Sequence, residues 1–298
     1  MNPRKILIFM FFIGLFVIYV NLESISKYLQ LDKVLPFNSE SNVTYLDVMK
    51  MRIENHKYEK GILKFKEKHI WILLHGKEDF VSNEIINHHI WDVSSIIELL
   101  LFMKSTRPVM LLDIGCGIGV STLVVGAHNY HVIAVDANIN NTKRLTQSVI
   151  ANQIEHKVTV INNAVSNFKQ EYSMTLNPRN VGSQKLMNKR YNEYKVKSIF
   201  LDELVPLIHR RIKVIIKIDI NGDEVRAFKK ASNLFDKRNI VAVLLNWKVV
   251  RELSDSQRLI DFLIEKGFAP FDSLFSKRIL ETMKHEDWNI EIVWKKVI

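Results

Sequence analysis

The chain has 298 residues, of which 47% are hydrophobic and 10% aromatic, so it can bury one large core. This composition excludes a disordered or low-complexity protein, and the single cysteine, Cys116, excludes an intrachain disulfide. The formal net charge of +10 comes from basic residues that are spread along the chain rather than gathered in one block. We therefore expect a solvated basic surface and no nucleic-acid partner.

The N-terminus carries a candidate membrane segment. Arg4 and Lys5 precede an uncharged apolar run, Ile6 to Val20, which is short for a plasma-membrane span but sufficient for the thinner bilayer of the early secretory pathway. No small-residue cleavage site follows the run, so we expect an uncleaved signal anchor, with a cleaved signal peptide and a buried core helix as alternatives. The expected organisation is a cytosolic tip and transmembrane helix in residues 1–22, a stem in residues 23–44 and a folded domain in residues 45–298.

The charges around this apolar run set its expected orientation. Both basic residues and the terminal amine precede the run, and positively charged flanks stay on the cytosolic side of a membrane. The folded domain of this single-pass protein would then lie in the lumen of the endoplasmic reticulum or Golgi. The membrane is therefore an expected partner, through the N-terminal helix.

From about residue 45 the hydrophobic pattern alternates between strands and helices. This order, with short loops, predicts right-handed parallel crossovers in an open sheet. We expect an α/β fold with a doubly wound, Rossmann-like sheet of seven mostly parallel strands and an antiparallel last strand. Predicted strands are Val109–Ile114, Val132–Asp136, Val158–Asn162, Ile212–Ile220, Ile240–Trp247, and a last pair in residues 268–275 and 288–297; predicted helices are Ile96–Met103, Ser121–Ala127, Asn140–Asn152, Asp223–Leu234 and residues 254–267, with a less regular stretch in residues 167–195.

The first of these strands runs into a glycine-rich turn. Gly115, Gly117 and Gly119 form the sequence G-C-G-I-G, and their missing β-carbons let a ligand lie directly against the turn and the next helix. Asp136 ends the second strand, the position from which a carboxylate accepts both hydroxyls of a ribose. A tight turn without a ligand would explain the glycines but not the acid. The pattern therefore predicts an adenosine-type ligand at the carboxyl ends of the strands.

Nicotinamide dinucleotides and S-adenosyl-L-methionine both contain adenosine. The diphosphate of a dinucleotide favours G-x-G-x-x-G without a nearby acid, whereas this chain has G-x-G-x-G with Asp113 two residues before the first glycine. S-adenosyl-L-methionine carries an ammonium and a sulfonium, which a carboxylate in the turn attracts. The expected cofactor is therefore S-adenosyl-L-methionine, and an NAD-dependent oxidoreductase is the alternative of a different class.

The motifs D-I-G-C-G-I-G and V-D-A-N are similar to those of class I methyltransferases, and further segments resemble the FkbM family among them. These segments are DFVSNEIINHHIWD (Asp79 to Asp92), NNAVSN (Asn162 to Asn167), SIFLDELV (Ser198 to Val205) and IIKIDINGDEVRAFKKA (Ile215 to Ala231). The resemblance covers roughly residues 79–250. It implies a methyltransferase that acts on a hydroxyl or related group of a sugar or natural product, and it leaves the acceptor unnamed.

The resemblance and the strand ends together assign expected roles to residues. Asp219 ends the strand Ile212–Ile220, close to where the reacting methyl group would lie, and Glu224 opens the next helix, where a helix-capping charge is the alternative explanation. We expect these two as catalytic residues. Expected cofactor contacts are Asp113, Gly115, Gly117, Gly119, Asp136, Asn138 and Asn163.

Two amides depart from the family pattern. Asn221 stands where the family usually has a glutamate, and Asn246 stands where an acid is common. An amide orients a hydroxyl but cannot take its proton at neutral pH. We therefore expect O-methylation of a hydroxyl on a glycan, lipid or secreted small molecule, with an inactive cofactor-binding scaffold as the alternative. Asp219 and Asn246 give two candidate metal ligands without a third, so no metal is expected.

Overall fold

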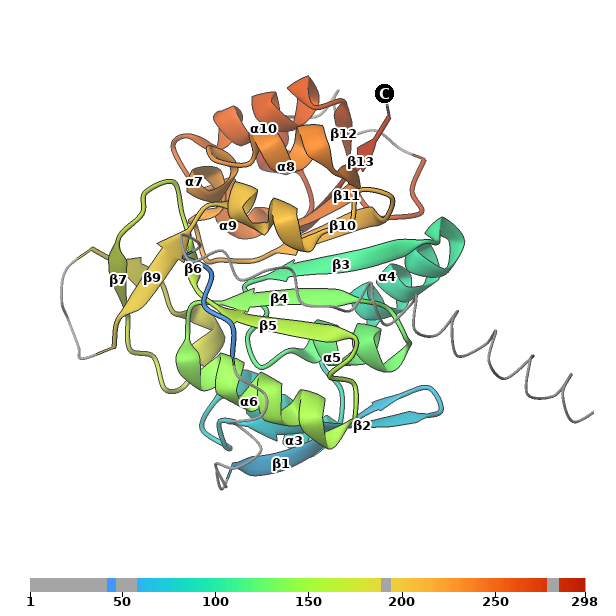
Figure 1. Cartoon of the computed structure of the whole chain (residues 1–298), viewed down its shortest axis with the longest axis vertical. Coiled ribbons are helices and arrows are strands. Elements are labelled where there is room, and N and C mark those ends of the chain that lie inside the picture. The colour runs from blue at the N-terminus through green and yellow to red at the C-terminus, as the bar shows by residue number, and fades with distance from the viewer. Residues whose placement is uncertain (1–41, 47–57, 189–193, 278–283, 298) are drawn as a thin grey trace, which may run out of the picture. The chain divides into compact units, whose positions relative to one another are not determined.

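The computed structural model describes residues 42–46, 58–188, 194–277 and 284–297 (Figure 1). Its main sheet has seven strands in the order β12-β13-β11-β10-β3-β4-β5. The neighbours from β11 to β5 pair in parallel, whereas β13 is antiparallel to both β11 and β12. The predicted doubly wound sheet with an antiparallel last strand is confirmed. The strands are β3 (Val109–Ile114), β4 (Val132–Asp136), β5 (Val158–Asn162), β10 (Lys213–Ile218), β11 (Asn239–Asn246), β12 (Phe268–Phe271) and β13 (Glu291–Lys296).

Both faces of this sheet are buried. All six residues of β3 are buried, and its side chains alternate between two hydrophobic clusters: Leu112 belongs to one cluster and Leu111 to the other. Such alternation is what a parallel strand covered on both sides requires. Figure 1 shows α5 and α6 on one side of the strands and α7, α8 and α10 on the other. The helices are α3 (Phe80–His88), α4 (Val93–Thr106), α5 (Val120–Ala127), α6 (Ile139–Ala151), α7 (Glu224–Phe228), α8 (Ser232–Lys237), α9 (Trp247–Val250) and α10 (Ser256–Glu265).

The helix predicted over Asp223–Leu234 is wrong in its length, because it is divided into α7 and α8. The cause is Asp202, which lies in the 3-10 helix η2 (Leu201–Leu207). Its carboxylate accepts a hydrogen bond from the backbone N–H of Leu234 at 2.8 Å, and its own N–H donates to the carbonyl of Lys230. Asp202 therefore caps a new helix start that the local sequence pattern does not reveal.

Two smaller sheets are absent from the sequence prediction. β1 (Glu59–Phe65) and β2 (Lys68–Leu74) form an antiparallel hairpin, which packs Leu63, Phe65 and Ile72 into the same cluster as α4 and α5. A four-stranded sheet in the order β6-β9-β7-β8 includes part of the stretch that the sequence left irregular. Its strands are β6 (Ala164–Val165), β7 (Glu171–Met174), β8 (Leu186–Met187) and β9 (Val196–Ile199); the remaining 3-10 helices are η1 (Val181–Ser183) and η3 (His285–Asp287).

Residues 42–46 lie along the edge strand β5. Tyr45 forms an antiparallel bridge with Ile161, and Val43 is buried in the core. Residues 42–44, which we expected in the stem, therefore pack with the folded domain. The expected signal anchor in residues 1–22 lies outside the described residues, and none of the described helices is long and apolar enough to cross a membrane.

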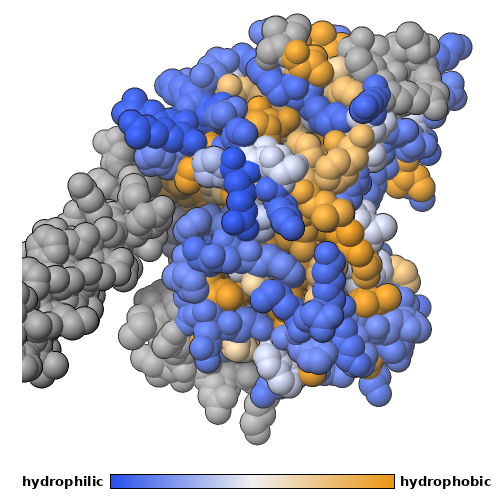
Figure 2. Space-filling view, turned by 90° about the vertical axis from the view of Figure 1, so that its right-hand side faces the viewer, coloured by the Kyte–Doolittle hydropathy of each residue, from blue (hydrophilic) through white to orange (hydrophobic). Residues whose placement is uncertain are grey.

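Figure 2 shows one face of the molecule on which apolar residues gather in a patch bordered by hydrophilic ones. Large apolar side chains exposed in the described part of the chain include Leu101 of α4 and Phe275, whose ring packs edge-on against Phe102. The helix α4 is thus apolar beyond the side that it buries.

Candidate functional site

The carboxyl ends of the central strands open into one cavity of about 650 Å³. The cavity is bounded by the ends of β3, β4, β10 and β11, by the loop before α4 and by residues 180–184. This is where doubly wound sheets bind their ligands, and the volume lies in the range of small-molecule sites. The predicted site residues that line it are Gly115, Gly117, Gly119, Asp136, Asn163 and Asp219.

The glycine turn has positive φ at all three glycines. A β-carbon on Gly115 would stand 1.9 Å from the carbonyl oxygen of Asp219, and one on Gly119 would stand 2.2 Å from Leu145. A β-carbon on Gly117 would meet no described atom within 4 Å. Two glycines are therefore required by protein packing, while the third leaves open space beside the cavity for a ligand.

Asp136 lies beside this turn with most of its surface buried. Its Oδ2 accepts a hydrogen bond from the N–H of Gly117 at 2.8 Å, and its Oδ1 accepts from the N–H of Asn138 at 2.8 Å and the side chain of Asn141 at 3.1 Å. Burial raises the pKa of this carboxyl, and the hydrogen bonds oppose that shift. Oδ2 keeps one acceptor position, because a carboxylate oxygen accepts two hydrogen bonds.

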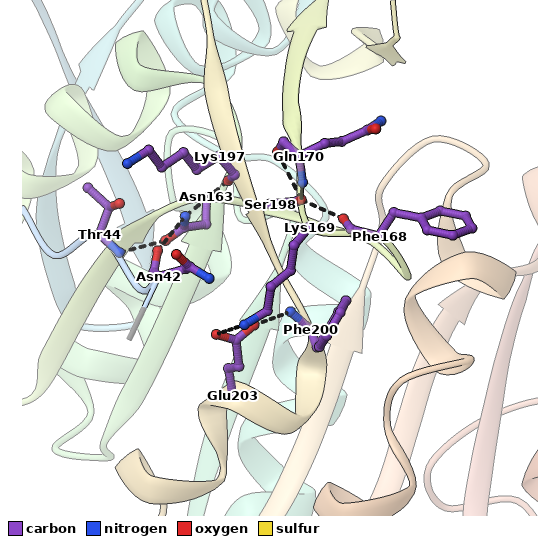
Figure 3. Close-up of polar contacts among 10 residues, drawn as sticks. All are labelled: Asn42, Thr44, Asn163, Phe168, Lys169, Gln170, Lys197, Ser198, Phe200 and Glu203. Carbon is purple, nitrogen blue, oxygen red and sulfur yellow. Dashed lines mark hydrogen bonds and ion pairs between the residues drawn. The ribbon is translucent and has the colours of Figure 1, made fainter. Parts of the chain in front are cut away.

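Asn163 lies at the cavity, but its side chain holds the fold. Its Oδ1 accepts from the N–H of Thr44 at 2.7 Å, and its Nδ2 donates to the carbonyls of Asn42 and Lys197 at 3.1 and 3.0 Å (Figure 3). The amide thus ties residues 42–44 and β9 to the end of β5, with its oxygen and both amide hydrogens in use. Three of the four hydrogen-bonding positions of this amide are therefore taken within the protein, and the second acceptor position of its oxygen is what stays open for the expected cofactor contact.

Asn138 lies outside the cavity lining. Its side-chain oxygen caps α6 by accepting from the N–H of Asn140, and its Nδ2 donates to Gln184 at 2.7 Å. The expected contact with the cofactor is thus replaced by a support for residues 180–184, which do line the cavity.

Asp113 also lies outside the cavity lining, because it is fully buried beneath the turn. Its Oδ2 accepts from the hydroxyl of Thr122 at 2.7 Å, and its Oδ1 stands 3.7 Å from the Nζ of Lys217. Lys217 does line the cavity. Burial by itself lowers the pKa of Lys217, but the negative charges of Asp113, Asp219 and Asp92 outweigh it and raise this pKa. The expected acid of the turn is therefore covered by a lysine that it keeps charged.

Asp219 directly follows β10 and lines the cavity, the position that we expected for it. Its Oδ2 accepts a long hydrogen bond, 3.4 Å, from the Nδ2 of Asn246 at the end of β11. Asp219 Oδ1 and Asn246 Oδ1 are buried and have no hydrogen-bond donor among the described residues. These two oxygens point to a ligand that supplies hydrogen-bond donors. Within the described chain, no group of three His, Cys, Asp or Glu side chains could hold a metal ion.

The expected catalytic role of Glu224 is wrong. The side chain is fully buried, does not line the cavity, and accepts from the N–H of Ile220 at 2.8 Å and of Gly222 at 2.9 Å. Burial raises the pKa of this carboxyl to about 7. Glu224 therefore holds the loop after β10 rather than contacting a substrate.

Asn221 has a use that a glutamate could not serve. Its Nδ2 donates to the carbonyls of Gly182 and Gln184 at 2.8 and 3.1 Å. A carboxylate has no hydrogen to donate at neutral pH. The amide therefore fastens residues 180–184 over the cavity, and it does not by itself indicate lost activity.

Asp79 is a site residue to which the sequence analysis gave no role. It caps α3 by accepting from the N–H of Ser82 through Oδ2, and its Oδ1 accepts from the N–H of Val181 at 2.9 Å. The acid before an apolar helix is a recognisable capping signal. Its second bond, to a residue about a hundred positions later, has no local signal.

The family model described as Tellurite resistance protein TehB matches residues 77–181 of this chain. No curated protein matches the chain. Among solved structures, the chain is similar to a SAM-dependent O-methyltransferase from Thermotoga maritima, with 11% identity, a TM-score of 0.39, and 85% of this chain and 98% of that chain covered. It is similar to precorrin-6y C5,15-methyltransferase from Geobacter metallireducens (10% identity, TM-score 0.37, 70% and 90% covered) and to M. jannaschii TYW2 in complex with AdoMet (14%, 0.35, 82% and 90%).

The TehB match runs from before α3 through the glycine turn and into residues 180–184, so it spans much of the cavity wall. Together with the position of the cavity, this match supports a class I methyltransferase domain with S-adenosyl-L-methionine as its cofactor. The FkbM resemblance stays a prediction.

Proposed function

We propose that this chain transfers the methyl group of S-adenosyl-L-methionine to a hydroxyl of a glycan, lipid or secreted small molecule. The observation that carries the proposal is a pair of oxygens, Asp219 Oδ1 and Asn246 Oδ1, that have no hydrogen-bond donor among the described residues and belong to side chains lining the cavity that begins at the glycine turn. Hydroxyl groups supply the hydrogen-bond donors that these oxygens lack.

The turn and Asp136 fit the adenosine part of the cofactor. Gly117 leaves open space where a side chain would project, and Asp136 Oδ2 keeps an acceptor position for a ribose hydroxyl. The bound cofactor supplies a methyl group on a positively charged sulfur. Residues 180–184, held by Asp79, Asn138 and Asn221, line the same cavity.

Asp219 is the residue that we assign to the acceptor. Its Oδ1 is free to accept the hydrogen of an acceptor hydroxyl, while Asn246 fixes its Oδ2. A positioned base adds about a hundred- to ten-thousandfold to a rate, and the alignment of reactants contributes about 7 to 11 kcal/mol. Orientation by Asp219 and Asn246 is therefore the larger contribution, and proton acceptance by Asp219 is the smaller one.

Labelled methyl transfer tests this function. The full chain is incubated with methyl-labelled S-adenosyl-L-methionine and extracts of glycans, lipids and hydroxylated small molecules, and the products are identified by mass spectrometry. We expect label in an ether linkage that survives mild base. Binding of the cofactor without label in any extract would instead support the inactive scaffold.

We further propose that the domain is lumenal and anchored by residues 1–22, because Arg4 and Lys5 precede the apolar run. Protease added to sealed microsomes should then spare the chain after residue 22. Digestion of the folded domain in intact microsomes would place it on the cytosolic side.

A further inference from the structure

Lys217 is a partly buried cation at the cavity that the proposed reaction has not used. It lies on β10 directly opposite Asp113 of β3, and the two side chains stand 3.7 Å apart, Nζ to Oδ1. The side chain of Asp113 is 1% exposed, whereas that of Lys217 is 25% exposed. The lysine therefore covers the acid and presents its ammonium group to the cavity.

The hydrogen-bonding capacity of this ammonium group is unused. An N–O separation of 3.7 Å is too long for a hydrogen bond, and no acceptor in the described part of the chain lies within hydrogen-bonding distance of Lys217 Nζ. An ammonium group has three hydrogens to donate. A partly buried charge whose donors have no protein acceptor favours a ligand that brings one, preferably an anion.

Other cations at the cavity fit this task less well. Lys248 lines the cavity but lies on the exposed side of α9. His75 bonds to Asn141 at 2.6 Å, and burial lowers its pKa, so it is neutral at physiological pH. Lys217 is therefore the cavity cation whose charge the neighbouring acids favour and whose ammonium group has no hydrogen-bond acceptor among the described residues.

The position of Lys217 relative to Asp136 indicates which anion it meets. β3 lies between β4 and β10, so the two residues are separated by two strand spacings, on the order of 10 Å. An adenosyl amino acid whose ribose lies at Asp136 extends its amino-acid end over such a distance. That end carries one carboxylate.

We propose that Lys217 binds the carboxylate of the methyl donor's amino-acid end, and that Asp113 is a positioning residue that holds Lys217 charged and in place. This inference rests on the proposed function. It also changes the role expected for Asp113, which was a cofactor contact that attracts the donor's ammonium and sulfonium. The two assignments differ in which part of the ligand each variant should affect.

Ligands that lack one group at a time test the assignment. The full chain is titrated by calorimetry with S-adenosylhomocysteine, with its decarboxylated analogue, which keeps the amine, and with 5′-methylthioadenosine, which lacks both groups. Loss of the carboxylate should weaken binding to the wild type about ten- to a hundredfold. Lys217→Met should lower the affinity for S-adenosylhomocysteine by a similar factor and leave the affinity for the decarboxylated analogue within about threefold of the wild-type value.

Asp113→Asn distinguishes a positioning role of Asp113 from direct binding of the ligand's amine. If Asp113 acts through Lys217, this variant binds S-adenosylhomocysteine more weakly, and its affinity for the decarboxylated analogue is unchanged. Weaker binding of the decarboxylated analogue would show that Asp113 itself holds the amine, and would overturn its positioning role. Lys213→Met, the same change at the opposite end of β10, is the control and should leave all three affinities unchanged.

The wild-type ligand series alone keeps the proposal falsifiable if both buried variants fail to fold. Equal affinity of wild type for S-adenosylhomocysteine and its decarboxylated analogue would overturn the role of Lys217 while leaving the proposed function intact. Failure to bind any of the three ligands would overturn the proposed function itself. A lysine that contacts the acceptor instead would leave S-adenosylhomocysteine affinity unchanged in Lys217→Met and raise the acceptor KM.

Discussion

The strand ends on the two sides of the glycine turn differ in how their polar groups are used. At the ends of β4 and β5, Asp136 and Asn163 accept or donate several hydrogen bonds within the protein. At the ends of β10 and β11, Asp219 and Asn246 each keep a buried oxygen that lacks a donor among the described residues, and Lys217 keeps its hydrogens unused. On the β10 and β11 side this sheet edge is therefore prepared for ligands, whereas on the β4 and β5 side most hydrogen-bonding positions are taken within the protein and Asp136 Oδ2 keeps one open for a ligand.

This difference separates support from chemistry. A buried side chain whose bonds are all made within the protein contributes to stability, and its loss is measured as unfolding free energy. A buried group without a partner lowers stability and is retained where a ligand completes it. The variants described next test whether each residue stabilises the fold or binds a ligand, as its hydrogen bonds indicate.

Gly115→Ala should have the largest effect on stability, because Gly115 packs directly against the backbone of Asp219. The added β-carbon would stand 1.9 Å from the backbone oxygen of Asp219, so we expect several kcal/mol of lost unfolding free energy in urea denaturation. Gly117→Ala is the matched control, since its β-carbon meets nothing and only its positive φ costs about 1 to 2 kcal/mol. Equal stability of the two variants would contradict the packing at Gly115.

Glu224→Gln tests a residue that the structure moves from catalysis to support. Because the pKa rises from 4.5 to about 7 on folding, the folded state binds more protons than the unfolded state in this range, and the stability that Glu224 contributes falls as the pH rises through it. At 1.36 kcal/mol per pKa unit, the wild-type advantage over Glu224→Gln should fall by about 3 kcal/mol. Urea denaturation at several pH values measures this difference. A constant difference, or weaker S-adenosylhomocysteine binding in the variant, would contradict the structural role.

Asp219→Asn tests the side that is prepared for ligands. Removing the charge and the proton acceptor should lower methyl-transfer turnover by about a hundredfold or more, while the affinity for S-adenosylhomocysteine stays within a few-fold. Turnover with a labelled acceptor and calorimetry of the same preparation give the two quantities. Equal losses in both would mean that Asp219 binds the cofactor rather than the acceptor.

Asn163→Ala tests the opposite side and should have a smaller effect. The variant loses three hydrogen bonds to Thr44, Asn42 and Lys197, which at about 1 kcal/mol each, with partial compensation by water, gives about 2 kcal/mol of unfolding free energy. We expect the affinity for S-adenosylhomocysteine to stay within about threefold, since this amide makes its bonds within the protein. A tenfold loss of affinity with unchanged stability would return Asn163 to the cofactor site.

Much of the sheet could be predicted from the sequence, because its signals are local. The predicted bounds of β3, β4 and β5 agree with the structure, since each is an apolar run ended by a glycine, an acid or an asparagine. The hairpin of β1 and β2 was missed because its turn, at Lys66 and Glu67, has no glycine or asparagine, although Lys66 adopts a positive φ. The alternation of buried and exposed residues in β1 was the signal that could have revealed it.

The site was predicted less completely, because hydrogen bonds between distant residues decide it. The glycine turn, Asp136 and Asp219 reach the cavity as expected, since strand ends alone place them there. The side chain of Asn163 instead hydrogen-bonds to residues 42–44, which lie about 120 positions earlier in the chain. Asp113 is covered by Lys217 of another strand. A polar residue at a strand end can be placed near the cavity from the sequence alone. The sequence does not show whether its hydrogen bonds are already made to other parts of the protein.

The central claim is that the cavity at the strand ends binds an adenosyl methyl donor through Asp136. Calorimetric titration of the full chain with S-adenosylhomocysteine and with NAD, in the wild type and in Asp136→Ala, measures it directly. We predict saturable binding of S-adenosylhomocysteine, none of NAD, and a loss of about ten- to a hundredfold in Asp136→Ala from the missing charged hydrogen bond to the ribose. Preferential binding of NAD, or unchanged S-adenosylhomocysteine affinity in a folded Asp136→Ala variant, would contradict the claim.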